Sequence, residues 1–238
     1  MQRLGPLLHN HHMEGESNMS GAEMLFEDRR EAGRRLAERL QSYANERPVV
    51  FALPRGGVPV GAEVSRSLGA PLEVIVSRKI GAPGQPEFGI GAVAPGGVRI
   101  LNERVVRALG IPGDYLDQVS ARESEEVERR LRLFRGDHPY PDLEQRTAIL
   151  VDDGLATGVT ARAALLALRR LNPRRLVLAV PVCAPSSAEL LRPETNDLIC
   201  LLMPDDLEAV GLWYRNFEQV PDEEVMRLLD EAQRPAEP

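Results

Sequence analysis

The sequence is poor in cysteine and has neither an excess of positive charge nor a long apolar run. Cys183 and Cys200 are the two cysteines of the 238 residues, without Cys-x-x-Cys spacing, so we expect free thiols. Acidic residues outnumber basic ones 36 to 29, which argues against the basic face of a nucleic-acid-binding protein. No apolar run approaches the roughly 20 residues that span a bilayer, and the N-terminus has no secretory-signal pattern. We expect a cytoplasmic protein that binds neither nucleic acid nor membrane.

Lysine is nearly absent as well. Lys79 is the single lysine among 29 basic residues, and all the others are arginines. A compact ammonium can make point contact with a phosphate oxygen, and a guanidinium cannot make a contact of that kind. Lys79 is therefore a candidate phosphate ligand, with compositional drift as the alternative.

The chain is organised around residues 147–160, TAILVDDGLATGVT. This stretch reads as a buried strand, an acid pair, a turn rich in Gly and Thr, and the start of a helix over 161–171. Free N–H groups at the helix start, with the threonine hydroxyls, form a cup of donors that suits a phosphate. The carboxylates would repel a phosphate, so they suit neutral hydroxyls of the same ligand, or a Mg²⁺ that the ligand brings. The implied ligand is a sugar phosphate, and its candidate contacts are Asp152, Asp153, Gly154, Ala156, Thr157, Gly158, Val159 and Thr160.

Two more candidate anion sites follow predicted strands. Arg55, Gly56 and Gly57 come after the strand over 49–53, and Arg78 and Lys79 come after the strand over 72–77. Ligands of parallel α/β sheets bind at the carboxyl ends of the strands. All three sites are therefore predicted at one edge, although the Arg-Gly-Gly sequence alone also fits a bare turn.

Strands and helices alternate along the chain, which predicts an α/β fold with a doubly wound, mostly parallel sheet and helices on both faces. We expect one domain over 21–232, a disordered leader over 1–20 and a frayed tail over 233–238. A capping box at Ser20 and Glu23 predicts a first helix over 20–41 with a solvated charged face. The true start is open among Met1, Met13, Met19 and Met24.

Two segments are unusual in composition. Residues 81–97 hold six glycines and three prolines, which favours a flexible lid over a passive linker, with a short β-ribbon as an option. Residues 203–220 form a candidate hood that contains Trp213, Tyr214 and Phe217. These rings fit stacking on a planar base, while packing against the sheet is the alternative for at least two of them.

VDDGLATGVT after an apolar strand resembles the ribose-phosphate-binding signature of the type I phosphoribosyltransferases, in which two acidic residues precede a Thr-Gly-x-Thr cup. The stretches LPRGGVPVG, SRKIGAPGQPEFGIGAV and GLWYRNFEQV are similar to an uncharacterised branch of that family, and the resemblance runs from about Met24 to Leu229. It implies a homodimer in nucleotide metabolism. Its reaction would transfer the 5-phosphoribosyl group from phosphoribosyl pyrophosphate to a nitrogenous acceptor with Mg²⁺ and release pyrophosphate.

The resemblance also implies roles. Asp152 and Asp153 would hold the ribose hydroxyls, with Mg²⁺ nearby through substrate and waters, and residues 156–160 would hold the 5-phosphate. Arg55 to Gly57 would bind pyrophosphate through a cis peptide before Gly56, and Arg78 and Lys79 would close over it with the lid. Carboxylates near the sugar and cations near the leaving group stabilise the charges that develop as the C1–O bond breaks. The implied catalytic residues are Asp152, Asp153, Lys79 and Arg55, and Glu87 is a candidate for proton transfer.

The acceptor stays open. Ala156 occupies the place where hypoxanthine- and guanine-type members carry an aspartate, which weakens a 6-oxopurine interpretation. A non-catalytic sensor of phosphoribosyl pyrophosphate is the alternative to an enzyme. A Walker-type nucleotide site or a phospho-receiver domain fits the sequence poorly, because their diagnostic residues are missing.

Overall fold

The computed structural model describes residues 25–234. The predicted leader, the capping box at Ser20 and Glu23 and the four alternative start methionines lie outside these residues. Helix α1 covers Arg29–Arg39 and residues 25–28 are not helical, so the predicted continuous helix over 20–41 is wrong. Asp28 caps α1 instead, because its carboxylate accepts the backbone N–H of Glu31 at 2.8 Å.

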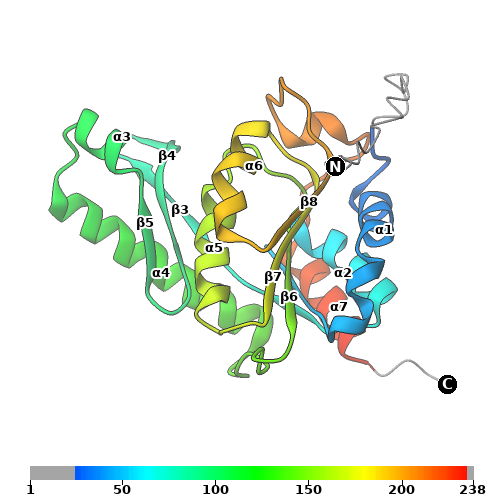
Figure 1. Ribbon diagram of the computed structural model, residues 1–238. Coiled ribbons are helices and arrows are strands. Elements are labelled where there is room, and N and C mark those ends of the chain that lie inside the picture. Colours follow the sequence, from blue (N-terminus) through cyan, green and yellow to red (C-terminus); the bar gives the residue numbers. More distant parts are fainter. Residues whose placement is uncertain (1–24, 235–238) are drawn as a thin grey trace, which may run out of the picture.

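The centre of the molecule is a five-stranded sheet in the order β2-β1-β6-β7-β8 (Figure 1). Every neighbouring pair in it is parallel. The central strands β1 and β6 are buried along their whole length, as near-continuous apolar runs in a covered sheet should be. The strands are β1 Val49–Ala52, β2 Leu72–Val74, β6 Thr147–Val151, β7 Arg175–Val182 and β8 Asp197–Leu202.

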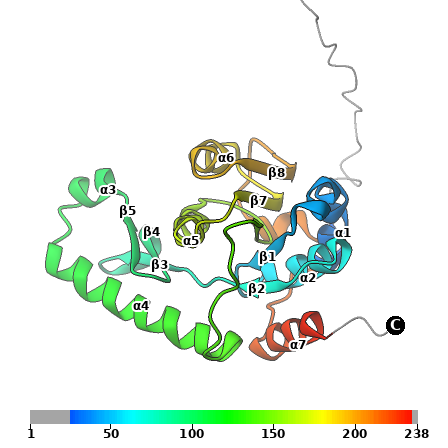
Figure 2. The ribbon, with the colours of Figure 1, turned by 60° about the horizontal axis from the view of Figure 1, so that its bottom comes forward.

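Helices cover both faces of this sheet (Figure 2). Alternate residues of the central strands enter two different cores. Val50 and Ile149 pack with side chains of α1, α2 and α7, whereas Phe51 and Leu150 pack with those of α5 and α6. The doubly wound prediction is confirmed. The helices are α2 Gly57–Leu68, α5 Val159–Arg169, α6 Pro185–Leu191 and α7 Asp222–Gln233, with short 3-10 turns at Gln41–Glu46, Arg192–Glu194 and Val210–Trp213.

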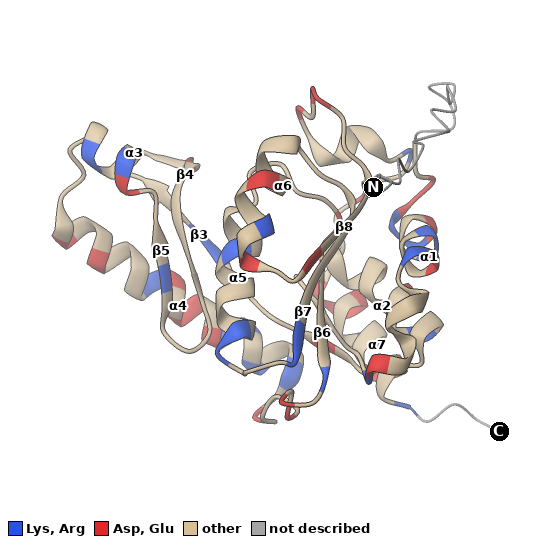
Figure 3. Cartoon of the chain, in the orientation of Figure 1, with Lys and Arg blue, Asp and Glu red and all other residues tan. Residues whose placement is uncertain are grey.

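A separate arm projects from the sheet and includes most of the Gly-rich segment (Figure 1). Strands β3 Arg78–Ala82, β4 Gln85–Ala94 and β5 Val98–Leu101 form an antiparallel sheet, followed by α3 Glu103–Ala108 and α4 Gly113–Arg135. Most of residues 81–97 therefore lie in paired strands, as the β-ribbon alternative predicted, and they do not form an irregular loop. Charges of both signs are interspersed along α4 (Figure 3).

No helix within residues 25–234 is both long enough and apolar enough to cross a membrane.

Candidate active site

Strand β6 ends at the acid pair, and the turn between β1 and α2 lies against it. A Cβ atom added to Gly56 would lie 1.9 Å from Oδ2 of Asp153, and one added to Gly57 would lie 2.8 Å from the carbonyl oxygen of Val151. Only glycine allows this approach. The structure thus brings two sequence-predicted sites into contact, Arg55 to Gly57 and the acid pair. The cis peptide joins Pro54 and Arg55, one residue earlier than the resemblance implies.

Arg29 of α1 enters the same site, which the sequence did not indicate. Its Nε donates to Oδ2 of Asp153 at 2.8 Å, and its Nη1 donates to the carbonyl oxygen of Glu218 at 2.8 Å. The guanidinium carbon lies 3.7 Å from the centre of the Phe217 ring. We predicted a solvated charged face for this helix, and that is wrong for Arg29, whose side chain is only 11% exposed.

Burial and proximity govern the charge of the acid pair. Burial raises the pKa of Asp152 well above its usual range, and the neighbouring Asp153 carboxylate raises it further. Burial also raises the pKa of Asp153, while the Arg29 guanidinium opposes that rise. The two carboxylates therefore have different environments: Asp153 has a cationic partner in contact, and Asp152 accepts the backbone N–H of Asp153 at 2.9 Å.

Residues 203–220, the hood segment, pack over the acid pair through Tyr214. The ring of Tyr214 lies 5.3 Å from that of Phe26 and 5.0 Å from that of Phe217, centre to centre. Its hydroxyl donates to the carbonyl oxygen of Asp153 at 2.5 Å. Tyr214 and Phe217 thus pack within the protein, the alternative that the sequence left open. Trp213 is half-buried, and its stacking on a base stays a prediction.

We expect Tyr214→Phe to lower the free energy of unfolding by about 1–2 kcal/mol, because it removes the hydrogen bond that the buried Tyr214 donates to the carbonyl oxygen of Asp153. Urea denaturation followed by circular dichroism measures the change. An unchanged midpoint and slope would contradict the importance of this contact for the loop that carries Asp153.

The predicted phosphate cup lies in the loop after β6. Leu155 exchanges backbone hydrogen bonds of 2.9 Å with Val182 and Ala184, and the Ser187 hydroxyl donates to the Ala156 carbonyl oxygen at 2.6 Å. Ser187 therefore fixes this loop, and Ala184 occupies the N-cap position of α6 without a side-chain bond.

Gly158 begins α5 with a φ of 67°, a conformation that suits glycine, and no side chain caps this end. Within the described part of the chain, the backbone N–H groups of residues 157–160 have no acceptor. Orphan donors at a helix N-terminus favour an anion. The arrangement around Thr157 and Thr160 is therefore free to receive a phosphate.

The remaining predicted cations are paired with carboxylates of the protein. Arg78 lies 2.9 Å from Glu123, Lys79 lies 3.0 Å from Glu87, and Arg55 lies at a longer 3.7 Å from Asp222 of α7. Lys79 also donates to the carbonyl oxygen of Glu87 at 2.8 Å.

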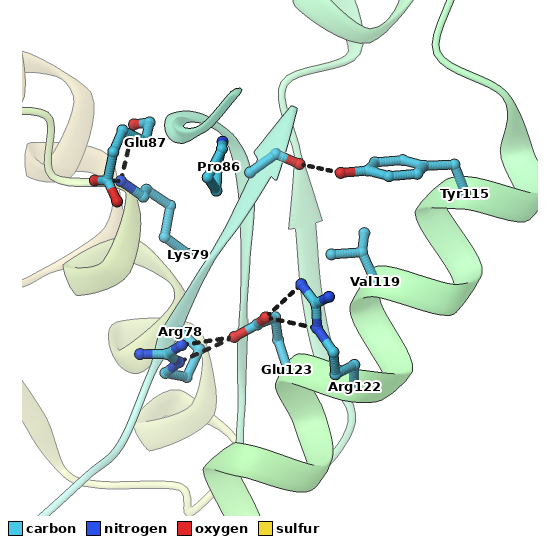
Figure 4. A pocket seen from close by; sticks show the side chains of 9 residues that line it. Arg78, Lys79, Pro86, Glu87, Tyr115, Val119, Arg122 and Glu123 are labelled. Carbon is cyan, nitrogen blue, oxygen red and sulfur yellow. Dashed lines mark hydrogen bonds and ion pairs between the residues drawn. The ribbon is translucent and has the colours of Figure 1, made fainter. Parts of the chain in front are cut away.

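Arg78 and Lys79 line a pocket of about 330 Å³ between β3 and α4 (Figure 4). Its other walls include Tyr115 and Arg122, and the acid pair is not among its lining residues. Glu87 is almost fully exposed. The structure thus places Arg78, Lys79 and Glu87 on the arm, apart from the contacts that join Arg55 to Gly57 with the acid pair.

The residues of the site offer Mg²⁺ limited coordination. Across residues 25–234, no three His, Cys, Asp or Glu side chains gather as metal ligands. Carboxylate oxygens do suit Mg²⁺, which commonly binds through one or two carboxylates plus substrate phosphates. Asp152 and Asp153 fit that pattern.

Comparisons with known proteins agree with this geometry. A family model described as "Phosphoribosyl transferase domain" matches residues 23–212. A Mycobacterium tuberculosis protein named "Putative phosphoribosyl transferase Rv0571c" is 44% identical over 210 residues, which are 88% of this chain and 47% of that protein. The chain thus spans about half the length of the curated relatives that it matches.

Two further similarities cover very different shares of this chain. The crystal structure of TT1426 from Thermus thermophilus is similar with a TM-score of 0.74 and 43% identity, covering 87% of this chain and 99% of that one. A uracil phosphoribosyltransferase of Lactobacillus gasseri is 38% identical over 74 residues, which are 31% of this chain and 35% of that protein.

Proposed function

The chain belongs to the phosphoribosyl transferase family, and from this premise we propose that it transfers the 5-phosphoribosyl group of phosphoribosyl pyrophosphate to a nitrogenous acceptor, with release of pyrophosphate. The observation that carries the proposal is the contact of Gly56 and Gly57 with the acid pair, beside an uncapped helix N-terminus. A phosphate cup, a sugar site and a second anion site then follow one another along a single ligand. The acceptor is a nucleobase or a related heterocycle.

Each part of the site has a task in this reaction. The N–H groups of residues 157–160 bind the 5-phosphate, and Asp152 and Asp153 accept hydrogen bonds from the ribose hydroxyls. As the C1–O bond breaks, positive charge develops on the ribose, which the carboxylates stabilise. Arg55 and the backbone of Gly56 and Gly57 bind the pyrophosphate, whose negative charge grows. Mg²⁺, when bound, supplies further charge compensation at the leaving group.

Arg78 and Lys79 can contact the ligand only after they leave their present partners. Both are engaged by carboxylates of the arm, Glu123 and Glu87. We propose that Lys79 leaves the highly exposed Glu87 and that the β3–β4 hairpin closes over the ligand, which would exclude water from the sugar cation. The homodimer and the cytoplasmic location stay predictions, as does proton transfer by Glu87.

Isothermal titration with phosphoribosyl pyrophosphate, with and without Mg²⁺, tests the proposal. We expect binding that Mg²⁺ strengthens, and we expect ribose 5-phosphate to bind more weakly because it lacks the group that Arg55 contacts. A pyrophosphate-release screen over nucleobases in the same buffer then identifies the acceptor. Binding without release for any base would favour the non-catalytic sensor, and no binding would refute the proposed function.

A further inference from the structure

Two arginines share the carboxylate of Glu123 on α4 (Figure 4). One oxygen, Oε2, accepts a hydrogen bond from Nε of Arg78 at 3.0 Å and lies 2.9 Å from Nη2 of the same side chain. The other oxygen, Oε1, accepts from Nε and Nη2 of Arg122 at 3.2 and 3.0 Å. Within residues 25–234, these two guanidinium groups are the only side chains that donate to Glu123. Each oxygen of the carboxylate therefore has its own cationic partner.

The three side chains differ in burial. The side chain of Glu123 is only 9% exposed, whereas that of Arg122 is 73% exposed. A buried carboxylate is costly when no cation is in contact with it, while an exposed guanidinium can bind water instead. Glu123 can therefore lose one of its two arginines at little cost, but it cannot lose both.

The partner of Lys79 provides a contrast. Glu87 is 96% exposed, so water can solvate its carboxylate when Lys79 leaves. Glu123 has little access to water, and Arg78 can leave it cheaply only if a second cation stays behind. Arg122 is already in contact with Oε1, so it can fill this role without a rearrangement of the backbone.

From these contacts we propose that Arg122 is a positioning residue for Arg78. It compensates the charge of Glu123 when Arg78 leaves this carboxylate for the pyrophosphate group of the ligand. This inference rests on the proposed function, and it assigns Arg122 no contact with the ligand, because Arg122 acts through Glu123. The affinity for the ligand includes the cost of separating Arg78 from Glu123, and Arg122 keeps that cost small.

Urea denaturation of the ligand-free protein tests whether the two arginines can replace each other. We expect Arg78→Gln and Arg122→Gln each to lower the denaturation midpoint slightly, because each leaves Glu123 with one cation. The double variant should lower it by clearly more than the sum of the two single shifts, because it leaves Glu123 with none. This excess should disappear in a Glu123→Gln background. Additive shifts would overturn the inference.

Isothermal titration with phosphoribosyl pyrophosphate tests the effect on the ligand. Arg122→Gln should bind it about tenfold more weakly than the wild-type protein, because Glu123 then loses its last cation when Arg78 leaves. Arg122→Lys should recover part of this affinity, since the charge remains. The matched control is Arg130→Gln, which breaks a 2.7 Å ion pair between Arg130 and Glu126. Both members of that pair belong to α4, so this variant should bind the ligand as the wild-type protein does.

A Glu123→Gln background separates an indirect effect of Arg122 from a direct one. Since neither arginine then faces a buried charge, Arg122→Gln should no longer weaken binding. A loss that persists in this background would overturn the inference, because Arg122 would then act on the ligand directly, and so would an affinity that Arg122→Gln leaves unchanged in the wild-type background. If the wild-type protein does not bind the ligand, the proposed function fails. The denaturation measurements need no ligand and still decide whether Arg122 can replace Arg78 at Glu123.

Discussion

Asp152→Asn should remove most of the proposed phosphoribosyl transfer activity and at the same time raise the thermal midpoint of the protein at neutral pH. The activity falls because the amide cannot stabilise positive charge on the ribose, and electrostatic groups of this kind are worth about a hundredfold to a thousandfold in rate. The stability rises because the burial that raises the pKa of Asp152 makes its ionised form costly in the folded state. Asparagine keeps the Oδ1 acceptor that binds the N–H of Asp153.

The pH dependence of this gain has a definite sign. Since the folded-state pKa of Asp152 lies above the unfolded value, the stability that this carboxyl contributes to the wild-type protein is fully present below the unfolded pKa. That contribution is lost as the pH rises through the folded pKa. The asparagine variant does not titrate at this position. Its advantage in thermal midpoint should therefore grow between mildly acidic and neutral pH, as scanning calorimetry at several pH values would show. An advantage that is independent of pH would contradict the assigned cause.

Asp153→Asn is the matched comparison. It should reduce activity similarly but lower stability by about 2–3 kcal/mol, because it leaves the largely buried Arg29 guanidinium without its charge partner. Opposite stability effects at two adjacent aspartates would distinguish the charge-paired carboxylate from the uncompensated one. Equal stability effects would mean that Arg29 contributes little to the balance of the site.

Much of the backbone arrangement of the candidate site was predictable, because this arrangement depends on local sequence patterns. The apolar run before the acid pair predicted β6. Parallel strands then bring their carboxyl ends to one edge, which placed the Arg55 turn beside Asp153 without any contact information. The strand, loop and helix of the candidate phosphate cup were predictable for the same reason, since they follow one another directly in 147–169.

The missed features depend on distant partners. Nothing in the sequence of α1 separates Arg29 from the four other arginines of that helix; the distinction arises when α1 packs beside the hood segment, almost 190 residues away in sequence. The arm is a second case. Its glycines suggest an irregular segment, but cross-strand pairing between β3, β4 and β5 outweighs their weak strand propensity. The role of Lys79 as a phosphate ligand stays a prediction, and its pairing with Glu87 could not be predicted from composition.

The other large effect is expected from Gly56→Ala, the smallest change that can be made to the site. The backbone of Gly56 is helical, with φ −62° and ψ −34°, so alanine is conformationally acceptable there. The added methyl would lie 1.9 Å from Oδ2 of Asp153 and 3.2 Å from Nε of Arg29. Either the carboxylate or the turn must move. We expect binding of phosphoribosyl pyrophosphate to weaken more than tenfold, and stability to fall by about 1–3 kcal/mol.

Gly113→Ala is the control for this substitution, because Gly113 also lies at a helix start and an added Cβ there meets nothing within 4 Å. It should leave binding unchanged and alter stability by less than about 1 kcal/mol. A double-mutant cycle assigns the cause: in an Asp153→Ala background the stability cost of Gly56→Ala should largely disappear, because its principal clash is gone. If the full cost persists there, the close approach of Gly56 to Asp153 is not what couples the two loops, and the proposed pyrophosphate and sugar sites are positioned independently.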